Sequence, residues 1–118
     1  FPTVRLMPSR SDALGLVWME LGDEVVLETL GGHGGRWELG ASTTDLDFLE
    51  DVVRSVVAGR VVEVHALGRS RVTVTLSDGR PTVETGGVAP QGCLPLPGWT
   101  RWGRKTRYAS YANSDHAP

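Results

Sequence analysis

The chain has 118 residues, of which 40% are hydrophobic and 22% charged, with a formal net charge of −2. These are the values of one globular domain, and no apolar run approaches the roughly 20 residues of a membrane-spanning helix, so a helical membrane protein is excluded. Residues 20–63 carry ten acids against three bases, a net −7, whereas residues 64–118 carry three acids against seven bases, a net +4. If the two halves lie apart in space, a partner meets a dipolar molecule.

Cysteine usage and amino-acid bias indicate the compartment and the source. Cys93 is the only cysteine, so the chain alone can form neither an intramolecular disulfide nor a cysteine-based zinc site. We therefore expect a cytoplasmic protein. The bases are eleven arginines and one lysine, Lys105, and isoleucine is absent. This bias is typical of GC-rich coding and indicates a bacterial source.

The first forty residues predict strands joined by turns. Residues 1–12 contain two prolines and a polar run, which is typical of an irregular lead-in. Residues 14–20 are almost continuously apolar, as in a strand covered on both faces, and the turn Gly22-Asp23 leads into a second strand over residues 25–30. Residues 31–35, four glycines around a histidine, predict a flexible connector. A half-buried strand around Trp37 follows.

An amphipathic helix over residues 45–58 is the clearest prediction. Thr44 is placed to cap the first turn, Asp45 and Asp47 complement the positive end of the helix dipole, and Gly59 supplies a C-terminal stop. Apolar residues recur at spacings of three and four along one side. The stripe consists of Leu46, Leu49, Val52, Val53, Val56 and Val57.

After the helix, residues 62–66 and 72–77 alternate apolar and polar side chains and predict two half-buried strands. Strand side chains have a period of two, so the loop length decides which sets share a face. A three-residue loop, Gly68 to Ser70, puts both apolar sets on the face that the helix covers. Glu63, His65, Thr73 and Thr75 then lie together on the opposite face.

The next connection predicts a tight hairpin. A two-residue loop at Asp78-Gly79 pairs Val74 with Val83 and keeps both faces consistent. Pro81 lacks a backbone donor, so residues 80–85 are predicted to form a sheet edge.

The C-terminal third predicts a long ordered loop over residues 86–98, held by Leu94, Leu96 and Trp99, and a last strand within residues 104–111. Residues 112–118 are predicted to be a mobile tail. Together the elements predict one two-layer α+β domain, residues 1–118, in the order β-β-β-α-β-β-β. Its mostly antiparallel sheet of about six strands carries the helix on one face.

The predicted polar face offers a site for chemistry. Glu63 and His65 are two residues apart on one strand, where a carboxylate can orient a histidine as a base, and Thr73 and Thr75 are nearby. An enzyme or small-ligand binder using this face is one hypothesis. The simpler interpretation, which we favour, is an ordinary solvated sheet face.

Other motifs indicate no cofactor or metal. The glycine run of residues 31–35 opens a strand, whereas a phosphate-binding loop opens a helix and ends in Lys-Ser/Thr. His33, His65 and His116 are dispersed in the sequence, so we predict no metal site. Cys93 has no neighbouring base and is interpreted as a small buried hydrophobe.

Residues 99–111 are unusually basic and aromatic, with no acid up to Tyr111. Such a segment suits phosphates and stacked bases. The whole chain is acidic and has no recognised nucleic-acid motif, so we favour an acidic protein surface over nucleic acid. The candidate residues are Trp99, Arg101, Trp102, Arg104, Arg107 and Tyr108.

The acidic helix face of Asp47, Glu50 and Asp51 is a second candidate surface, for a basic partner, although acids early in a helix are favoured by the dipole alone. Catalytic groups are scarce and dispersed, whereas opposed charges suit recognition. The leading hypothesis is therefore a non-enzymatic protein-binding module, for which a small bacterial inhibitor or immunity-type protein is an example.

Overall fold

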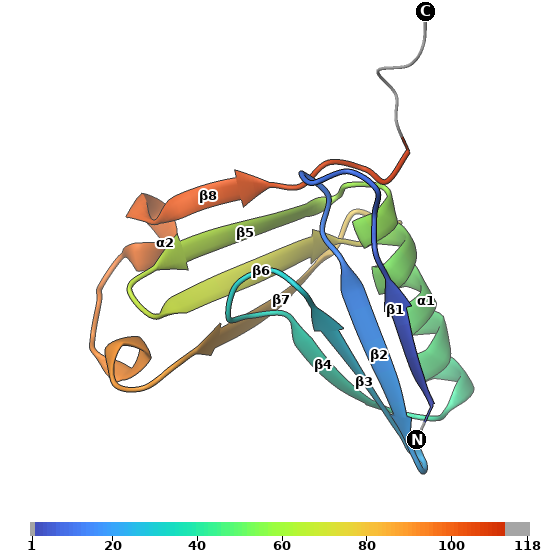
Figure 1. The fold of residues 1–118 in the computed structure, drawn as a ribbon. Helices are drawn as coiled ribbons and strands as arrows, with labels where there is room; N and C mark the ends of the chain where they lie inside the picture. The colour runs from blue at the N-terminus through green and yellow to red at the C-terminus, as the bar shows by residue number, and fades with distance from the viewer. Residues whose placement is uncertain (1, 113–118) are drawn as a thin grey trace, which may run out of the picture.

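The computed structural model describes residues 2–112, which form two four-stranded antiparallel sheets and one long helix (Figure 1). The fold class is α+β, as predicted, although two sheets replace a single one. Within residues 2–112 no helix is long and apolar enough to cross a membrane. Residues 113–118 of the predicted mobile tail, His116 included, lie outside the described residues.

The first sheet is an antiparallel meander of β1 (Thr3–Leu6), β2 (Leu16–Leu21), β3 (Glu24–Thr29) and β4 (Arg36–Gly40). The predicted turn at Gly22-Asp23 joins β2 to β3. The lead-in predicted to be irregular contains β1, which pairs with β2 along its whole length. Leu16 and Val17 point to opposite faces of β2 and are both buried, as the continuous apolar run indicates.

The helix α1 spans Thr43–Val57, within two residues of the predicted helix. Its N-cap is Ser42 rather than Thr44, because the Ser42 hydroxyl accepts a hydrogen bond from the Asp45 N–H (3.1 Å). Gly59 follows the helix at φ +83°, the left-handed conformation that ends many helices.

The helix α1 packs on both sheets, through β4 of the first and β6 of the second. Val52 and Val56 are fully buried between them, whereas Leu46 is 44% exposed, so the stripe that reaches the core is narrower than predicted. One core joins the helix to both sheets. Its buried members are Leu14, Leu16, Leu27, Trp37, Val52, Val56, Val61, Val72, Val74 and Leu76.

The second sheet has the strand order β7-β6-β5-β8. It is built from β5 (Val61–Ala66), β6 (Arg69–Thr75), β7 (Pro81–Gly87) and β8 (Arg104–Arg107). β7 is an edge strand, as Pro81 predicts. β8 returns to pair with β5 and forms the other edge (Figure 1).

The predicted connection between β5 and β6 is wrong by one residue. Ala66 pairs with Arg69, so the loop is the two residues Leu67 and Gly68 rather than Gly68 to Ser70. Gly68 sits at φ +64°, a conformation of tight hairpin turns that glycine adopts without steric cost. A change of one residue in the loop length moves every side chain of the strand to the opposite face of the sheet. Glu63 and His65 therefore share a face with the buried Val72.

The hairpin between β6 and β7 also differs in register. Val74 pairs with Thr82, not with Val83. The Leu76 N–H donates to the Arg80 carbonyl (2.8 Å), which leaves a three-residue loop that ends in Gly79 at φ +88°. Such a loop, with glycine in the left-handed position, is the common alternative to the predicted two-residue turn.

The ordered loop before β8 contains a short helical turn, η1 (Gln91–Cys93), and ends in the single turn α2 (Trp99–Trp102). Leu94, expected to hold the loop, is 49% exposed. The buried Arg69 holds it instead: its guanidinium donates to the carbonyls of Gln91 (2.7 Å) and Leu94. A charged side chain with backbone acceptors thus takes the place of Leu94, whereas the predicted anchor Trp99 is half-buried against Arg69 and Arg71.

Candidate functional site

The four residues of the predicted ligand face are divided between the two faces of the second sheet. Glu63 and His65 point to the inner face, with Val72 and the core, whereas Thr73 and Thr75 point to the outer face. The prediction that they lie together is wrong, because it depended on the three-residue loop between β5 and β6.

Glu63 is a fully buried carboxylate whose oxygens both accept hydrogen bonds. The Gly32 N–H donates to Oε2 (2.9 Å) and the Tyr108 hydroxyl donates to Oε1 (2.6 Å). His65 Nε2 lies 3.7 Å from Oε1. Burial, together with the hydrogen bond to Glu63, raises the pKa of the Tyr108 hydroxyl above its usual value. These groups fasten the glycine loop and β8 to β5, and none of the hollows described below is lined by Glu63 or His65.

The glycine loop, residues 31–35, is pinned to the second sheet rather than flexible. Ser70 is fully buried, and its hydroxyl accepts hydrogen bonds from the His33 N–H (2.7 Å) and the Gly34 N–H (2.8 Å). With Gly32 bonded to Glu63, three successive amides of the loop are occupied by side chains of this chain. The donors that a phosphate-binding loop presents to an anion are therefore taken here.

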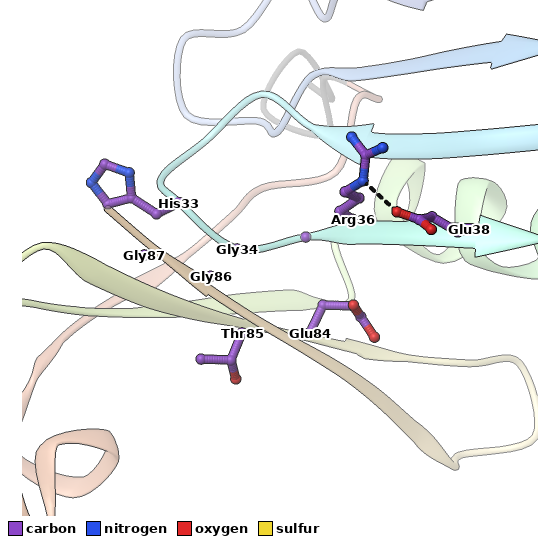
Figure 2. A pocket seen from close by; sticks show the side chains of 9 residues that line it. His33, Gly34, Arg36, Glu38, Glu84, Thr85, Gly86 and Gly87 are labelled. Carbon is purple, nitrogen blue, oxygen red and sulfur yellow. Dashed lines mark hydrogen bonds and ion pairs between the residues drawn. The ribbon is translucent and has the colours of Figure 1, made fainter. Parts of the chain in front are cut away.

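A polar cleft lies where the glycine loop and β4 face β7 (Figure 2). Its volume is about 380 Å³, with Arg36 and Glu38 on one wall and Glu84 on the other. Arg36 Nε donates to Glu38 (2.8 Å), and Arg36 also pairs with Glu28. Partial burial, and secondarily the nearby Glu38, raises the pKa of Glu84. The cleft is thus lined by two acidic side chains and one arginine, and that arginine is paired with Glu38.

The outer face of the second sheet is basic. Residues that pair directly across strands share a face, so the strand registers assign each side chain. Among the described residues this face carries four bases and no carboxylate. Its members are Val62, Val64, Ala66, Arg69, Arg71, Thr73, Thr75, Pro81, Val83, Thr85, Gly87, Lys105 and Arg107.

One end of the outer face is covered and the other is open. Trp99 of α2 lies with its ring 5.7 Å from the Arg71 guanidinium and 5.9 Å from that of Arg69, so the loop before β8 folds over that end. At the other end Val83 is 44% exposed.

A hollow of about 460 Å³ lies at this open end. Arg60 and Arg107 lie among its walls together with Thr73 and Thr75, and no carboxylate lines it. Arginine guanidinium groups and threonine hydroxyls are the donors that bind carboxylates and phosphates in proteins. Arg60 already donates to the Thr75 carbonyl (3.2 Å) and the Ser55 hydroxyl (3.3 Å), so Arg107 and the threonine hydroxyls are the donors that the hollow offers beside Val61 and Val62.

The candidate residues of the basic and aromatic segment occupy different environments. Arg101, Arg104 and Arg107 are exposed, as is Trp102 at 59%. Trp99 is half-buried against arginines, and Tyr108 is bonded to Glu63. The structure therefore leaves the bases and Trp102 on the surface and uses Trp99 and Tyr108 internally.

The predicted acidic surface of α1 is partly used within the fold. Asp51 accepts hydrogen bonds from the Ser77 N–H (3.0 Å) and the Ser77 hydroxyl (2.9 Å), which ties the helix to the β6–β7 loop. Glu50 pairs with Arg54 (3.2 Å). Asp47 is exposed and has no ion pair among the described residues. The helix thus offers a weaker acidic surface than its sequence indicates.

No protein-family model matches the chain, and no curated protein or solved structure is significantly similar to it. Residues 2–112 contain no group of three or more histidine, cysteine or carboxylate side chains that could hold a metal ion. Cys93, expected to be buried, is an exposed free thiol.

Sequence reasoning missed Ser70, Arg71 and Arg60. The signal for Ser70 and Arg71 was their alternation within residues 69–75, but it assigns faces only once the loop length is known.

A second hollow, about 360 Å³ and apolar, lies between Trp18 and the helix residues Leu46, Leu49 and Val53.

Proposed function

We propose that the protein is a non-enzymatic protein-binding module, and that the outer face of the second sheet binds an acidic surface of its partner. The observation that carries the proposal is the charge of that face: Arg71, Lys105 and Arg107 are basic, and no described side chain on it is a carboxylate. The hollow beside Arg107 offers a seat for an acidic side chain. Charge complementarity of this kind governs association rate and specificity.

The buried polar groups support binding over catalysis. A general base must lie within reach of its substrate. Glu63, the best candidate, is fully buried, and both its oxygens accept hydrogen bonds from this chain. A substrate would have to displace Gly32 or Tyr108 to reach it.

The aromatic residues favour a protein over nucleic acid. Single-stranded nucleic acid binds by stacking bases on exposed rings that lie within a basic groove. Trp99, whose ring lies over the basic face, is half-buried and already lies against Arg69 and Arg71. The exposed Trp102 donates its indole N–H to the Pro97 carbonyl (3.2 Å) at the far end of the sheet.

A small bacterial inhibitor or immunity-type protein of the cytoplasm is the kind of protein-binding module that we propose. An unpaired cysteine on the surface suits a reducing compartment. A second domain or a prosthetic group is not needed for this role, because recognition uses only the surface.

Lys105 provides a direct test, since it is the only lysine and lies on the proposed surface. A carbodiimide joins an amine to a carboxylate in contact with it, without adding a spacer. Treatment in extracts of the source cell should link Lys105 to an aspartate or glutamate of one protein, and peptide mass spectrometry identifies both residues. The purified partner is then titrated against the protein by calorimetry.

Matched double variants separate surface charge from total charge. Lys105→Glu with Arg107→Glu should weaken binding of the purified partner by tenfold or more, and added salt should weaken wild-type binding. Arg5→Glu with Arg54→Glu changes the net charge equally on exposed sites of β1 and α1, and should bind within twofold of wild type. Equal loss of affinity in both double variants would reject the proposal. It would also be rejected if Lys105 were cross-linked only to contaminating nucleic-acid-binding proteins and the purified protein bound single-stranded DNA tightly.

A further inference from the structure

The basic face ends in a strand with an open edge. β8 pairs with β5 on one side, and the sheet order places no strand of the described chain along its other side. The Tyr108 N–H donates to the Val61 carbonyl (3.2 Å). In an antiparallel pair the hydrogen-bonded positions alternate, so the backbone groups of Lys105 and Arg107 point away from β5.

The chain itself already adds backbone to this edge at one end. The Ala109 N–H donates to the Asp12 carbonyl (2.8 Å), and Ala13 forms a parallel bridge with Ala109. Residues 12 and 13 thus occupy the position of a fifth strand next to the residues that follow β8. Beside Arg104–Arg107 that position is open in the described structure.

The side chains of β8 specify the charge of an added strand. Arg104, Lys105 and Arg107 are exposed, so three of the four residues of the strand are basic. Lys105 and Arg107 project on the outer face, on the same side as Arg71. Opposite charges that face each other across strands stabilise the pair by about 0.2–1 kcal/mol, and like charges destabilise it.

A second copy of this chain is a poor occupant of the edge. Pairing β8 with another β8 would set arginine and lysine side chains against one another, which is how natural sheets protect their edges from self-association. An extended segment with acids at alternate positions meets the bases instead.

We propose that β8 accepts an extended acidic segment of the partner as a fifth strand of the second sheet. The inference rests on the proposed function, and it adds the mode of binding: main-chain hydrogen bonds to Lys105 and Arg107, with acidic side chains aligned along the outer face. Main-chain pairing supplies affinity, and the aligned bases select the acidic sequence.

Proline at position 105 tests the main-chain contact apart from the charge. Lys105→Pro and Lys105→Ala both remove the amine, but only proline removes the outward N–H, and neither removes a hydrogen bond to β5. The probe is a capped octapeptide of alternating glutamate and valine, with alternating lysine and valine as its control. We expect Lys105→Pro to bind the glutamate peptide about tenfold more weakly than Lys105→Ala. A tenfold change in affinity corresponds to about 1.4 kcal/mol, which is the contribution of one hydrogen bond.

Amide hydrogen exchange provides the second measurement and a check on folding. Saturating glutamate peptide should slow exchange at Lys105 and Arg107 in the wild type, and near-ultraviolet circular dichroism should match between the two position-105 variants. Equal affinities of Lys105→Pro and Lys105→Ala, with loss of binding only on charge reversal, would reject strand addition and leave face docking intact. Absence of peptide binding, or tighter binding of a 20-nucleotide single strand, would also overturn the strand model.

Discussion

At the scale of single residues, the hydrogen bonds of Glu63 explain why a polar side chain is retained in the core. Removing it leaves the Gly32 N–H and the Tyr108 hydroxyl without their acceptor, and each orphaned group costs about 1–3 kcal/mol. We predict that Glu63→Ala lowers the free energy of unfolding by about 3 kcal/mol, and that Glu63→Gln lowers it less because one amide oxygen still accepts. Urea unfolding measures both. Glu24→Ala, an exposed acid, is the control and should change little; a Glu63→Ala variant as stable as that control would contradict the structural role.

Glu84, in the polar cleft, gives the fold a pH dependence. Its pKa is higher in the folded state than the ordinary value of 4.5. Protonated Glu84 therefore adds to the free energy of unfolding, and this contribution is complete below pH 4.5. The contribution is lost as the pH rises through the pKa of the folded state. At pH 7 the ionised Glu84 therefore opposes folding. We predict that Glu84→Gln stabilises the protein at pH 7, by at most about 1 kcal/mol because the site is partly solvated. Urea unfolding at pH 7 and pH 3.5 should show the gain at the first and not at the second.

At the scale of elements, the glycine loop and β7 are fitted backbone to backbone. A Cβ at Gly86 would fall inside the His33 carbonyl oxygen, so main chain would have to move to accommodate it. We predict that Gly86→Ala lowers the free energy of unfolding by about 2 kcal/mol and speeds hydrogen exchange at the His33 and Gly34 amides. Gly15→Ala is the control, because its closest contact is the partly exposed Leu30 side chain at 3.2 Å. Unchanged exchange in Gly86→Ala would contradict the close fit.

The length of the loop between β5 and β6 decides which side chains of β5 face the core. With the two-residue Leu67-Gly68 loop, Glu63 faces the core and holds the glycine loop. The three-residue alternative would have placed its carboxylate in solvent beside Thr73. The alternation of β5 is visible in the sequence, but its phase relative to β6 is not, because apolar side chains occur at both parities: Val61 is buried and Val62 is half-buried.

At the scale of the whole molecule, one core makes both sheets and the helix interdependent. Val52 is fully buried where α1 contacts both sheets, and the Trp37 indole N–H donates to the Thr82 hydroxyl (3.1 Å) between them. We predict a single unfolding transition, with coincident tryptophan fluorescence and far-ultraviolet circular dichroism. Val52→Ala should shift both signals together, by about 2 kcal/mol, whereas Val83→Ala, on the exposed outer face, should shift neither. Separate transitions for the two signals would show that the sheets fold independently.

The separation of charge seen in the sequence is also a whole-molecule property. Bases gather on the outer face of the second sheet, while α1 and the first sheet carry most of the acids. The basic and aromatic segment predicted from the sequence, residues 99–111, supplies Lys105 and Arg107 to this face. Trp99 and Tyr108 belong to internal interactions that sequence proximity to the bases does not reveal.

The sequence by itself determined the α+β class, the helix within two residues, the first hairpin, and the edge position of Pro81. These depend on local patterns: periodicity, capping residues and backbone conformations that a few neighbouring residues decide. Only the tertiary structure decided that there are two sheets, that β8 pairs with β5, and that Glu63 and Ser70 bind the glycine loop. These depend on pairing between segments more than thirty residues apart, for which the chain carries no local signal.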